Sequence, residues 1–393
     1  MPNIKKNQIS IIGGAGHVGF PLGLAFAYKN LKVNLIDKNT QLLKLISNGN
    51  IPFMEKGAKK VLNKCLKKKN LLTSTNIESI IYSKYIIICI GTPIDSNLKP
   101  KFKDFIKFFK DLKKYLHKDH IIIIRSSIYP GVVEKVEKIL KEKNNNIVYC
   151  PERIVQGKSL EELPKLPQII ASNNKKIINK VENLFKKITS RIILTSIPEA
   201  ELIKLFSNAN RYINFSIANQ FYLMCSSMNL DYSRIRNIMQ DGYERNLNLS
   251  KAGFTAGPCL LKDTMQLSSF FKKKFNLGHA AMNVNESMPD YIVGELKKIK
   301  NIKKKTIGIL GLSFKADNDD IRDSLAIKLL NNLKRSKFKV IQSDENYNNI
   351  KNVSKKDLIK KSSIIIIGAP HKQYKILKFP KNKKIIDIWN IIK

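Results

Sequence analysis

The sequence predicts an α/β protein in which two α/β domains are joined by a central helical region with a long helix. Short apolar runs alternate with lysine-rich helical stretches over residues 1–195, the pattern of a parallel sheet covered on both faces. Residues 196–302 show no strand-like run, and a second strand-and-glycine start opens residues 303–393. A chain of 393 residues exceeds one ordinary core, since domains of roughly 100–200 residues are the norm.

The first domain begins with a strand at 8–12, a helix at 18–28 and a strand at 32–36 that ends at Asp37. Between the first strand and the helix lies the motif made of Gly14, Ala15, Gly16, His17, Val18 and Gly19. The dinucleotide-binding fingerprint consists of a strand, a glycine turn, a helix and an acid about twenty residues on, and the first domain has all four. The second α/β domain also starts with a strand and glycine, so both domains are expected to be Rossmann-like.

This fingerprint predicts which cofactor is bound and how. The pyrophosphate is expected at the helix N-terminus, where backbone N–H groups are unpaired. Asp37 is expected to bind both ribose hydroxyls, and a carboxylate there repels a 2′-phosphate. NAD is therefore favoured over NADP.

Further strands of this sheet are expected at apolar runs that end just before polar residues. The runs are 85–90, 121–124, 147–150 and 192–194. The residues that follow them, at the edge where such sheets bind ligands, are Thr92, Pro93, Ser127, Glu152 and Arg153. Ordinary strand-ending turns and a structural salt bridge of Glu152 are equally compatible with the pattern.

The central region is predicted to start with one long helix at 199–228. Lys204 and Asn208 are four residues apart and share a face, with Glu201 one turn before Lys204, although a solvated face is the alternative. Downstream, Cys259 lies in a loop between Gly257 and the pair Lys262-Asp263. A thiolate can hold an aldehyde as a thiohemiacetal, so this cysteine suggests an oxidoreductase with a covalent step.

The last domain opens with a strand and glycine at 305–311, and strands are expected at 338–341, 364–367 and 385–388. The asparagine and lysine tracts 141–146 and 303–305 are expected to be solvated turns.

Composition narrows the class of protein. The 71 Lys+Arg against 31 Asp+Glu give a formal net charge of +40, but the lysines are spread along the chain, which favours compositional bias over a nucleic-acid surface. Five cysteines without a CxxC pair or nearby histidines predict no metal site and a reducing cytoplasm. A secretory leader at the N-terminus is disfavoured because its glycines fit the phosphate turn, and no segment is long enough to span a membrane.

Seven segments in order resemble the UDP-glucose/GDP-mannose dehydrogenase family of nucleotide-sugar dehydrogenases over essentially the whole chain. They are GAGHVGFP, GTP, RSSIYPG, CPERIVQGK, the E-x-x-K-x-x-x-N helix, GPCLLKD and GLSFKADNDDIRDS. The resemblance implies an N-terminal NAD domain, a central helical dimerisation region and a C-terminal nucleotide-sugar domain. It implies a homodimer through the central helix. The absence of a nucleic-acid or membrane partner is expected from the scattered lysines and from the lack of a spanning segment.

The activity implied by the resemblance is a four-electron oxidation of a hexose primary alcohol to a carboxylate by two NAD. Cys259 would be the nucleophile, Lys204 would stabilise the thiolate and the alkoxide, and Asn208 would be its hydrogen-bond partner. Asp263 would orient a water or Lys204, Glu152 would assist acid/base work, and Ser127 would keep a hydroxyl where the family commonly has threonine. The substrate would be contacted by Arg153, Arg245, Lys315 and Arg322.

Two departures bear on the sugar. Gln156 stands where the UDP-glucose branch usually carries a second glutamate, and GPCLLKD differs from the commoner glycine-glycine version. UDP-N-acetylhexosamines are thereby one candidate class, with UDP-glucose and GDP-mannose open. The rival functions are a two-electron hydroxyacid-type dehydrogenase, which would not use Cys259, and a non-catalytic nucleic-acid-binding protein.

Overall fold

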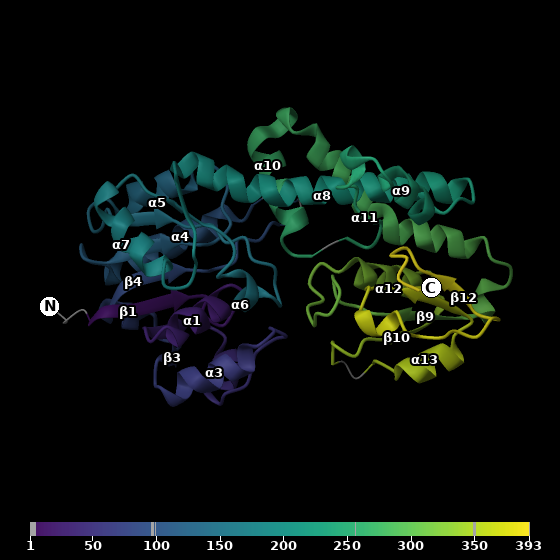
Figure 1. Cartoon of the computed structure of the whole chain (residues 1–393), viewed down its shortest axis with the longest axis horizontal. Helices are drawn as coiled ribbons and strands as arrows, with labels where there is room; N and C mark the ends of the chain where they lie inside the picture. The colour runs from purple at the N-terminus through teal and green to yellow at the C-terminus, as the bar shows by residue number, and fades with distance from the viewer. Residues whose placement is uncertain (1–4, 96–97, 99, 256, 349–350, 393) are drawn as a thin grey trace. The chain divides into compact units, whose positions relative to one another are not determined.

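The computed structural model describes residues 5–95, 98, 100–255, 257–348 and 351–392. The chain forms two compact units, which divide between Phe206 and Ser207 (Figure 1). Each unit contains one sheet, as the sequence predicts for an α/β chain with two α/β domains. The division into three domains at 195 and 302 stays a prediction.

The first unit is built on a sheet whose described strands follow the order β3-β2-β1-β4-β5-β6-β7-β8. Their bounds are β1 Lys5–Ile12, β2 Lys32–Ile36, β3 Leu71–Ser74, β4 Ser83–Ile88, β5 Ile121–Ile124, β6 Ile147–Tyr149, β7 Gln168–Ala171 and β8 Ile192–Thr195. The pairs are parallel except β6 with β7, which meet antiparallel at Tyr149 and Ala171. The expectation of a parallel sheet is wrong at that one pair, and β3 and β7 were not expected.

Helices cover both faces of this sheet. One face carries α1 (Gly19–Tyr28), α2 (Thr40–Ser47), α3 (Ala58–Lys67) and α7 (Lys175–Phe185), and the other carries α4 (Phe102–Leu112) and α5 (Val132–Leu140). A short helix, α6 (Ser159–Glu162), follows β6. Ile11 packs in the first layer and Ile12 in the second, which explains the unbroken apolar runs.

The order of the strands fixes where a ligand binds in this unit. After β1 the chain builds β2 and β3 on one side, then returns to β4 and β5 on the other. Loops that leave β1 and β4 at their carboxyl ends therefore diverge and leave a crevice, which is where sheets of this kind hold ligands.

The long helix α8 (Ile197–Ser227) confirms the predicted 199–228 helix with small shifts at its ends. It starts with a reciprocal cap: the Glu199 carboxylate accepts from the backbone N–H of Ser196 at 2.9 Å, and the backbone N–H of Glu199 donates to the Ser196 hydroxyl at 3.5 Å. Without glycine or further proline after Pro198, nothing interrupts the helix before Ser227.

The second unit combines helices with a smaller parallel sheet of order β10-β9-β11-β12. Its helices are α9 Tyr232–Gln240, α10 Leu260–Phe271, α11 Asn276–Lys297, α12 Leu325–Arg335 and α13 Lys355–Lys361, and its strands are β9 Thr306–Leu310, β10 Lys339–Ser343, β11 Ile364–Ile367 and β12 Lys384–Ile386. Residues of α11, α12, β9 and β11 share one apolar core.

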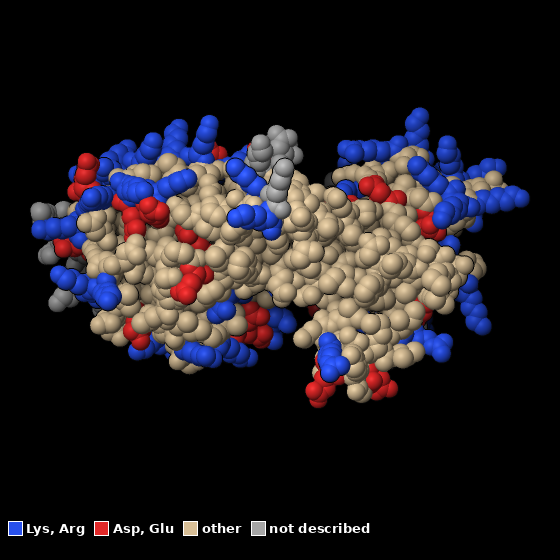
Figure 2. Space-filling view, turned by 90° about the horizontal axis from the view of Figure 1, so that it is seen from above, with Lys and Arg blue, Asp and Glu red and all other residues tan. Residues whose placement is uncertain are grey.

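On the face drawn in Figure 2 the surface charge is scattered. Figure 2 shows Lys and Arg side chains over both units, interspersed with Asp and Glu, rather than gathered in one patch. None of the described helices combines the length and apolar character needed to cross a membrane.

Candidate active site

The glycine-rich turn after β1 is packed so tightly that Gly14 and Gly19 have no room for a side chain. A Cβ on Gly14 would lie 2.8 Å from the carbonyl oxygen of Ile11, and one on Gly19 would lie 2.3 Å from the carbonyl oxygen of Gly13. These two glycines let the turn close on the strand and let α1 start directly against it.

Gly16 differs, because the closest atom to a Cβ there would be the Gly13 oxygen at 3.4 Å. The side of the turn that faces away from the sheet is therefore open at this residue. His17 and Val18 follow it and lead into the first turn of α1. An open glycine before a helix N-terminus gives a pyrophosphate close access to backbone N–H groups, so the turn fits the cofactor that the sequence predicts.

Asp37 lies at the end of β2, next to this turn. Its carboxylate accepts from the backbone N–H of Ala15 at 3.1 Å and from that of Asn39 at 3.0 Å. A carboxylate has about four acceptor sites, so partly exposed Asp37 retains capacity for ribose hydroxyls.

His17 links the turn to the loop after β6. Its ring stacks on Phe53 with centroids 3.9 Å apart, and its Nδ1 lies 2.8 Å from the side-chain nitrogen of Gln156. The residue that departs from the UDP-glucose branch thus contacts the cofactor turn.

Two loops end at the same sheet edge. The hydroxyl of Thr92, after β4, donates to the carbonyl oxygen of Ser127, after β5, at 2.5 Å. Pro93 accepts from the backbone N–H of Lys101 at 2.9 Å. The contact between Thr92 and Ser127 joins the loops of neighbouring strands beside the crevice.

Glu152 is held in a buried cluster after β6. Its carboxylate pairs with the Arg125 guanidinium and accepts from the backbone N–H groups of Arg153 and Ile154 at 2.7 and 2.9 Å. Arg125 also donates to Gln168 at 2.8 Å. The structural ion pair considered for Glu152 is present, and Arg125 is the partner that sequence reasoning did not name.

Arg153, beside it, is also engaged. Its guanidinium donates to the carbonyl oxygen of Pro167 at 2.6 Å and is partly buried.

The sequence did offer a signal for the pair of Arg125 and Glu152. Arg125 directly follows the isoleucine strand β5, and an arginine is almost never buried unless it is paired.

On α8, Lys204 and Asn208 lie on adjacent turns and both are buried, so the alternative of a solvated face is wrong. Glu201 caps α5 by accepting from the backbone N–H groups of Gly131 and Val133 at 2.8 and 3.0 Å. Burial raises the pKa of Glu201, and these N–H groups oppose that effect.

In the second unit, Cys259 immediately precedes α10 and is exposed. By contrast, burial raises the pKa of Cys65 to about 11 and that of Cys150 to about 12, which keeps both thiols protonated at neutral pH. Among these three, Cys259 alone is open to a substrate.

Asp263 lies one turn into α10 and is completely buried. It accepts from the Asn208 amide at 2.5 Å and pairs with Lys262 at 2.5 Å. Asn208 and Asp263, which the sequence places in different segments, are therefore direct partners.

The segment that leads to Cys259 is anchored to two helices; Ala256 within it lies outside the described residues. The backbone N–H of Gly253 donates to Asn219 of α8 at 2.9 Å, and Asn219 donates to Asn285 of α11 at 2.8 Å. Both asparagines are fully buried, so this amide pair fixes the segment through satisfied polar groups.

The segment also contacts the loop after β9. A Cβ on Gly257, whose φ is +111°, would lie 2.5 Å from the ring of Phe314. Arg322 is held by Asp320, with 2.6 Å between nitrogen and oxygen; this hydrogen bond raises the pKa of Arg322, and Cys259 is also an electrostatic neighbour of this guanidinium. The second unit thus brings Cys259, Phe314 and Arg322 together.

Lys315, next to Phe314, has its ammonium 5.8 Å from the centre of that ring. Arg245 instead lies exposed in the turn Glu244–Asn246 and donates to the Tyr243 hydroxyl at 3.1 Å. Among the described residues, the contacts of Arg245 are with Tyr243 and not with Cys259.

Comparison with known proteins covers the whole chain. The UDP-glucose/GDP-mannose dehydrogenase family is matched by its NAD binding domain over residues 7–189, its central domain over 198–287 and its UDP binding domain over 308–393. The chain belongs to this family. It is an NAD-dependent nucleotide-sugar dehydrogenase, and NAD is its cofactor.

Three relatives illustrate the similarity. The UDP-N-acetyl-D-mannosamine dehydrogenase of Pyrococcus horikoshii is 27% identical over 98% of this chain and 96% of its own, and its solved structure matches with a TM-score of 0.89. The UDP-N-acetyl-mannosamine dehydrogenase Cap5O of Staphylococcus aureus is 26% identical, with coverage of 98% and 95% and a TM-score of 0.87. A UDP-glucose dehydrogenase of Pyrobaculum islandicum, 21% identical over 98% and 95%, shares the fold with a TM-score of 0.87.

Within this nucleotide-sugar dehydrogenase, the contacts beyond the reach of sequence reasoning join distant segments. They are Arg125 with Glu152, Asn219 with Asn285, and Gly257 with Phe314. Glycine is required at Gly257 by its left-handed backbone and by the close Phe314 ring, but neither feature can be seen in the sequence.

Proposed function

We propose that this dehydrogenase oxidises the 6-hydroxymethyl group of UDP-N-acetyl-D-mannosamine to a carboxylate, through a covalent intermediate on Cys259. The observation that carries the covalent step is the exposed Cys259 beside Arg322 and the Phe314 loop. The uronate would be a precursor of a surface polysaccharide or glycan.

The chemistry proceeds in two oxidations. NAD, when bound, accepts a hydride from the sugar carbon in each of them. The first converts the alcohol to an aldehyde, with loss of the hydroxyl proton. The Cys259 sulfur then bonds to the aldehyde carbon and the thiol proton passes to the carbonyl oxygen, which gives a thiohemiacetal. Loss of a second hydride from the carbon and of the hydroxyl proton converts it to a thioester. Water breaks the carbon–sulfur bond and releases the carboxylate and the thiol.

Buried polar groups are proposed to stabilise the negative charge and to transfer the protons in these steps. Lys204 is proposed to stabilise the alkoxide and the thiohemiacetal oxygen, and Asn208 to donate to the same oxygen while Asp263 orients its amide. Glu152, which pairs with Arg125, is proposed to accept a proton from the water that attacks the thioester, and the Ser127 hydroxyl is proposed to assist it.

Binding roles follow the same division. We assign NAD to Gly14, Gly16, His17, Val18, Gly19, Asp37, Thr92 and Pro93. We assign the nucleotide sugar to Arg153, Lys315 and Arg322, and Arg245 to the sugar bound by a partner subunit. Guanidinium and ammonium groups suit a diphosphate because they offer charge-assisted hydrogen bonds.

The choice of sugar is supported by two observations. The Pyrococcus horikoshii and Staphylococcus aureus relatives at 26–27% identity carry the N-acetylmannosamine name. In addition, Gln156 replaces an acid by an amide and is held by His17, so the loop after β6 presents a neutral group where the UDP-glucose branch presents a charge.

The stoichiometry of NADH tests this proposal. Purified enzyme with limiting UDP-N-acetyl-D-mannosamine is expected to produce two NADH per sugar, measured by absorbance together with the uronate by mass spectrometry. One NADH per sugar with aldehyde as product would overturn the covalent second oxidation. Turnover of UDP-glucose, UDP-N-acetylglucosamine or GDP-mannose in place of this substrate would overturn the sugar assignment.

We further propose that the enzyme is a homodimer through α8. Between Arg211 and Asp231 the chain has no charged residue. Ile217, Phe221, Met224 and Met228 recur at helical spacing and are 39%, 37%, 57% and 68% exposed. Such an apolar stripe on a helix fits burial against a second copy.

Met224→Lys tests the dimer, because a lysine in the stripe would have to lose its water in the interface. We expect the wild type to be dimeric at micromolar concentration by light scattering and Met224→Lys to be monomeric. Ile376→Lys, at an apolar side chain 83% exposed elsewhere, serves as the control and should stay dimeric. A monomeric wild type would contradict the proposal.

A further inference from the structure

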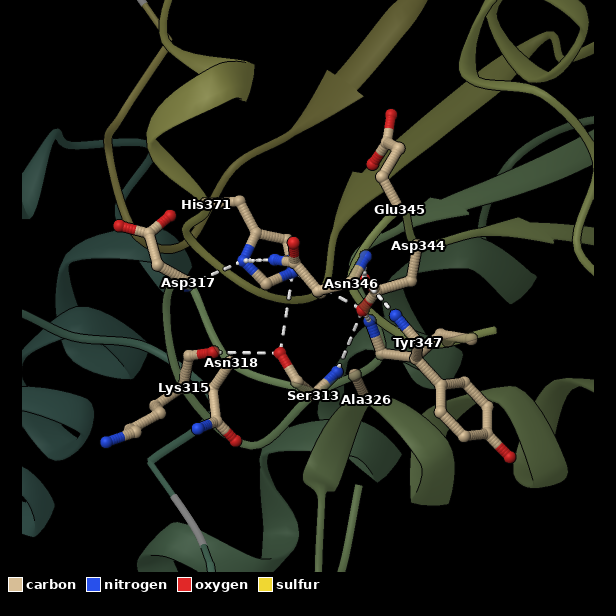
Figure 3. Close-up of polar contacts among 12 residues, drawn as sticks. Ser313, Lys315, Asp317, Asn318, Ala326, Asp344, Glu345, Asn346, Tyr347 and His371 are labelled. Carbon is tan, nitrogen blue, oxygen red and sulfur yellow. Dashed lines mark hydrogen bonds and ion pairs between the residues drawn. The ribbon is translucent and has the colours of Figure 1, made fainter. Parts of the chain in front are cut away.

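The sheet of the second unit repeats the switch of direction seen in the first. After β9 the chain adds β10 on one side and then β11 on the other. Asp344 follows β10, and His371 lies in the loop after β11, so both are at the carboxyl ends of the strands (Figure 3). This is the edge where such sheets bind ligands.

Asp344 at this edge is an internal anchor. It is completely buried, and one carboxylate oxygen accepts from the backbone N–H groups of Leu312 and Ser313 at 2.6 and 3.1 Å. Burial alone would raise the pKa of Asp344, but the hydrogen bond with His371 and the surrounding N–H groups hold it below its usual value. Asp344 therefore fixes the start of the loop after β9.

Asp37 in the first unit makes the contrast clear. Both acids follow the second strand of their sheet and accept from the neighbouring loop. Asp37 is partly exposed, whereas Asp344 is covered by His371, whose Nε2 lies 3.3 Å from its carboxylate. Asp344 has no exposed oxygen for a ribose, so its role differs from that of Asp37.

His371 fixes the other end of the loop. Its Nδ1 accepts from the backbone N–H of Asp317 at 2.8 Å. Because a backbone N–H is always the donor, Nδ1 carries no proton, and the proton of the neutral ring is on Nε2, which faces Asp344. The ring thus bridges the Asp344 carboxylate and the backbone N–H of Asp317.

Two further hydrogen bonds hold the loop after β9. The Asp317 carboxylate accepts from the backbone N–H of Lys372 at 3.0 Å, and the Ser313 hydroxyl donates to the carbonyl oxygen of Lys315 at 2.8 Å. Lys315 lies between these fixed points, and its side chain extends away from His371 (Figure 3).

We propose that His371 and Asp344 are positioning residues for nucleotide-sugar binding, which hold the 312–317 loop so that Lys315 is presented to the substrate. The proposal rests on the proposed function, because Lys315 is assigned there to the nucleotide sugar. A loop that is ordered before binding saves the entropy of ordering it in the complex, so loss of the anchor should weaken binding more than it slows the chemical steps.

Two substitutions at one position separate this role from simple packing. In His371→Asn the amide oxygen is as many bonds from Cα as Nδ1, so it can accept from Asp317. In His371→Gln the terminal amide reaches the place of Nε2 instead and leaves the Asp317 N–H unpaired. Both remove the ring, so a purely structural role would affect both alike. Lys372→Ala is the control, since it removes only the exposed ammonium, 3.5 Å from the Asp317 carboxylate.

Titration calorimetry with UDP and steady-state kinetics give the first readout. We expect His371→Gln to weaken UDP binding and raise KM for the nucleotide sugar about tenfold, with kcat nearly unchanged. His371→Asn and Lys372→Ala should stay within about twofold of the wild type. Equal losses in His371→Asn and His371→Gln, or no loss in either, would overturn the proposal.

Hydrogen exchange of peptides that cover 311–320, without ligand, gives a readout independent of the enzyme's activity. The loop should be protected in the wild type and in His371→Asn, and should exchange about tenfold faster in His371→Gln. If the wild-type enzyme bound no UDP but the variants still showed these differences in exchange, the assignment of Lys315 to the nucleotide would be refuted. The role of His371 in ordering the loop would then still stand. If neither variant folds, the wild type alone tests the proposal. Rapid exchange of this loop without ligand would refute the claim that His371 and Asp344 order it before substrate binds.

Discussion

Replacing Cys259 by serine is expected to lower the rate of uronate formation at least about 1,000-fold, because a serine hydroxyl is far less ionised than a thiol and forms no thioester. Cys259 immediately precedes α10 and is exposed, so its sulfur is open to a substrate. NAD binding should be unchanged, since the cofactor turn lies in the other unit. Uronate release is followed by mass spectrometry and NAD binding by calorimetry.

Cys225→Ser is the matched control for this prediction. Cys225 is a free, partly buried cysteine on α8 that packs against the core of the second unit. Its replacement should leave kcat within about twofold of the wild type, because it touches no proposed reacting group. Full turnover by Cys259→Ser would contradict the covalent mechanism and favour a reaction that does not use the thiol.

The sequence predicts the fold best where both faces of a strand are buried. The isoleucine runs of β5 and β11 could be assigned directly, because a strand between two helix layers has no polar side. β3 and β7 were not predicted because Leu71–Ser74 and Gln168–Ala171 contain polar residues and so lack the unbroken apolar run of β5 and β11.

The site is predictable only in its local parts. Spacing within one helix brings Lys204 near Asn208, and the turn chemistry identifies Gly14, Gly16 and Gly19. The pairing of Asn208 with Asp263 depends on how α10 packs against α8, which no local pattern encodes. The same holds for the anchor of Asp317 on His371, where partners are remote in sequence.

Gly16→Ala is expected to weaken NAD binding about 100-fold while the protein stays as stable as the wild type. A methyl group there would meet no protein atom closer than 3.4 Å, so the fold tolerates it. It would project into the space through which the pyrophosphate approaches the backbone, and each tenfold loss corresponds to about 1.4 kcal/mol. Calorimetry with NAD and thermal unfolding measure the two effects separately.

Gly19→Ala is the comparison variant for Gly16→Ala, because a methyl group at Gly19 would clash with the protein itself. Its Cβ would lie 2.3 Å from the Gly13 oxygen and 2.9 Å from the Gly14 Cα, so α1 must move away from the turn. We expect a loss of about 1–3 kcal/mol in the free energy of unfolding along with weaker NAD binding, as is usual for overpacking. If Gly16→Ala were as destabilising as Gly19→Ala, or bound NAD as tightly as the wild type, the open side of the turn would not be where the pyrophosphate binds.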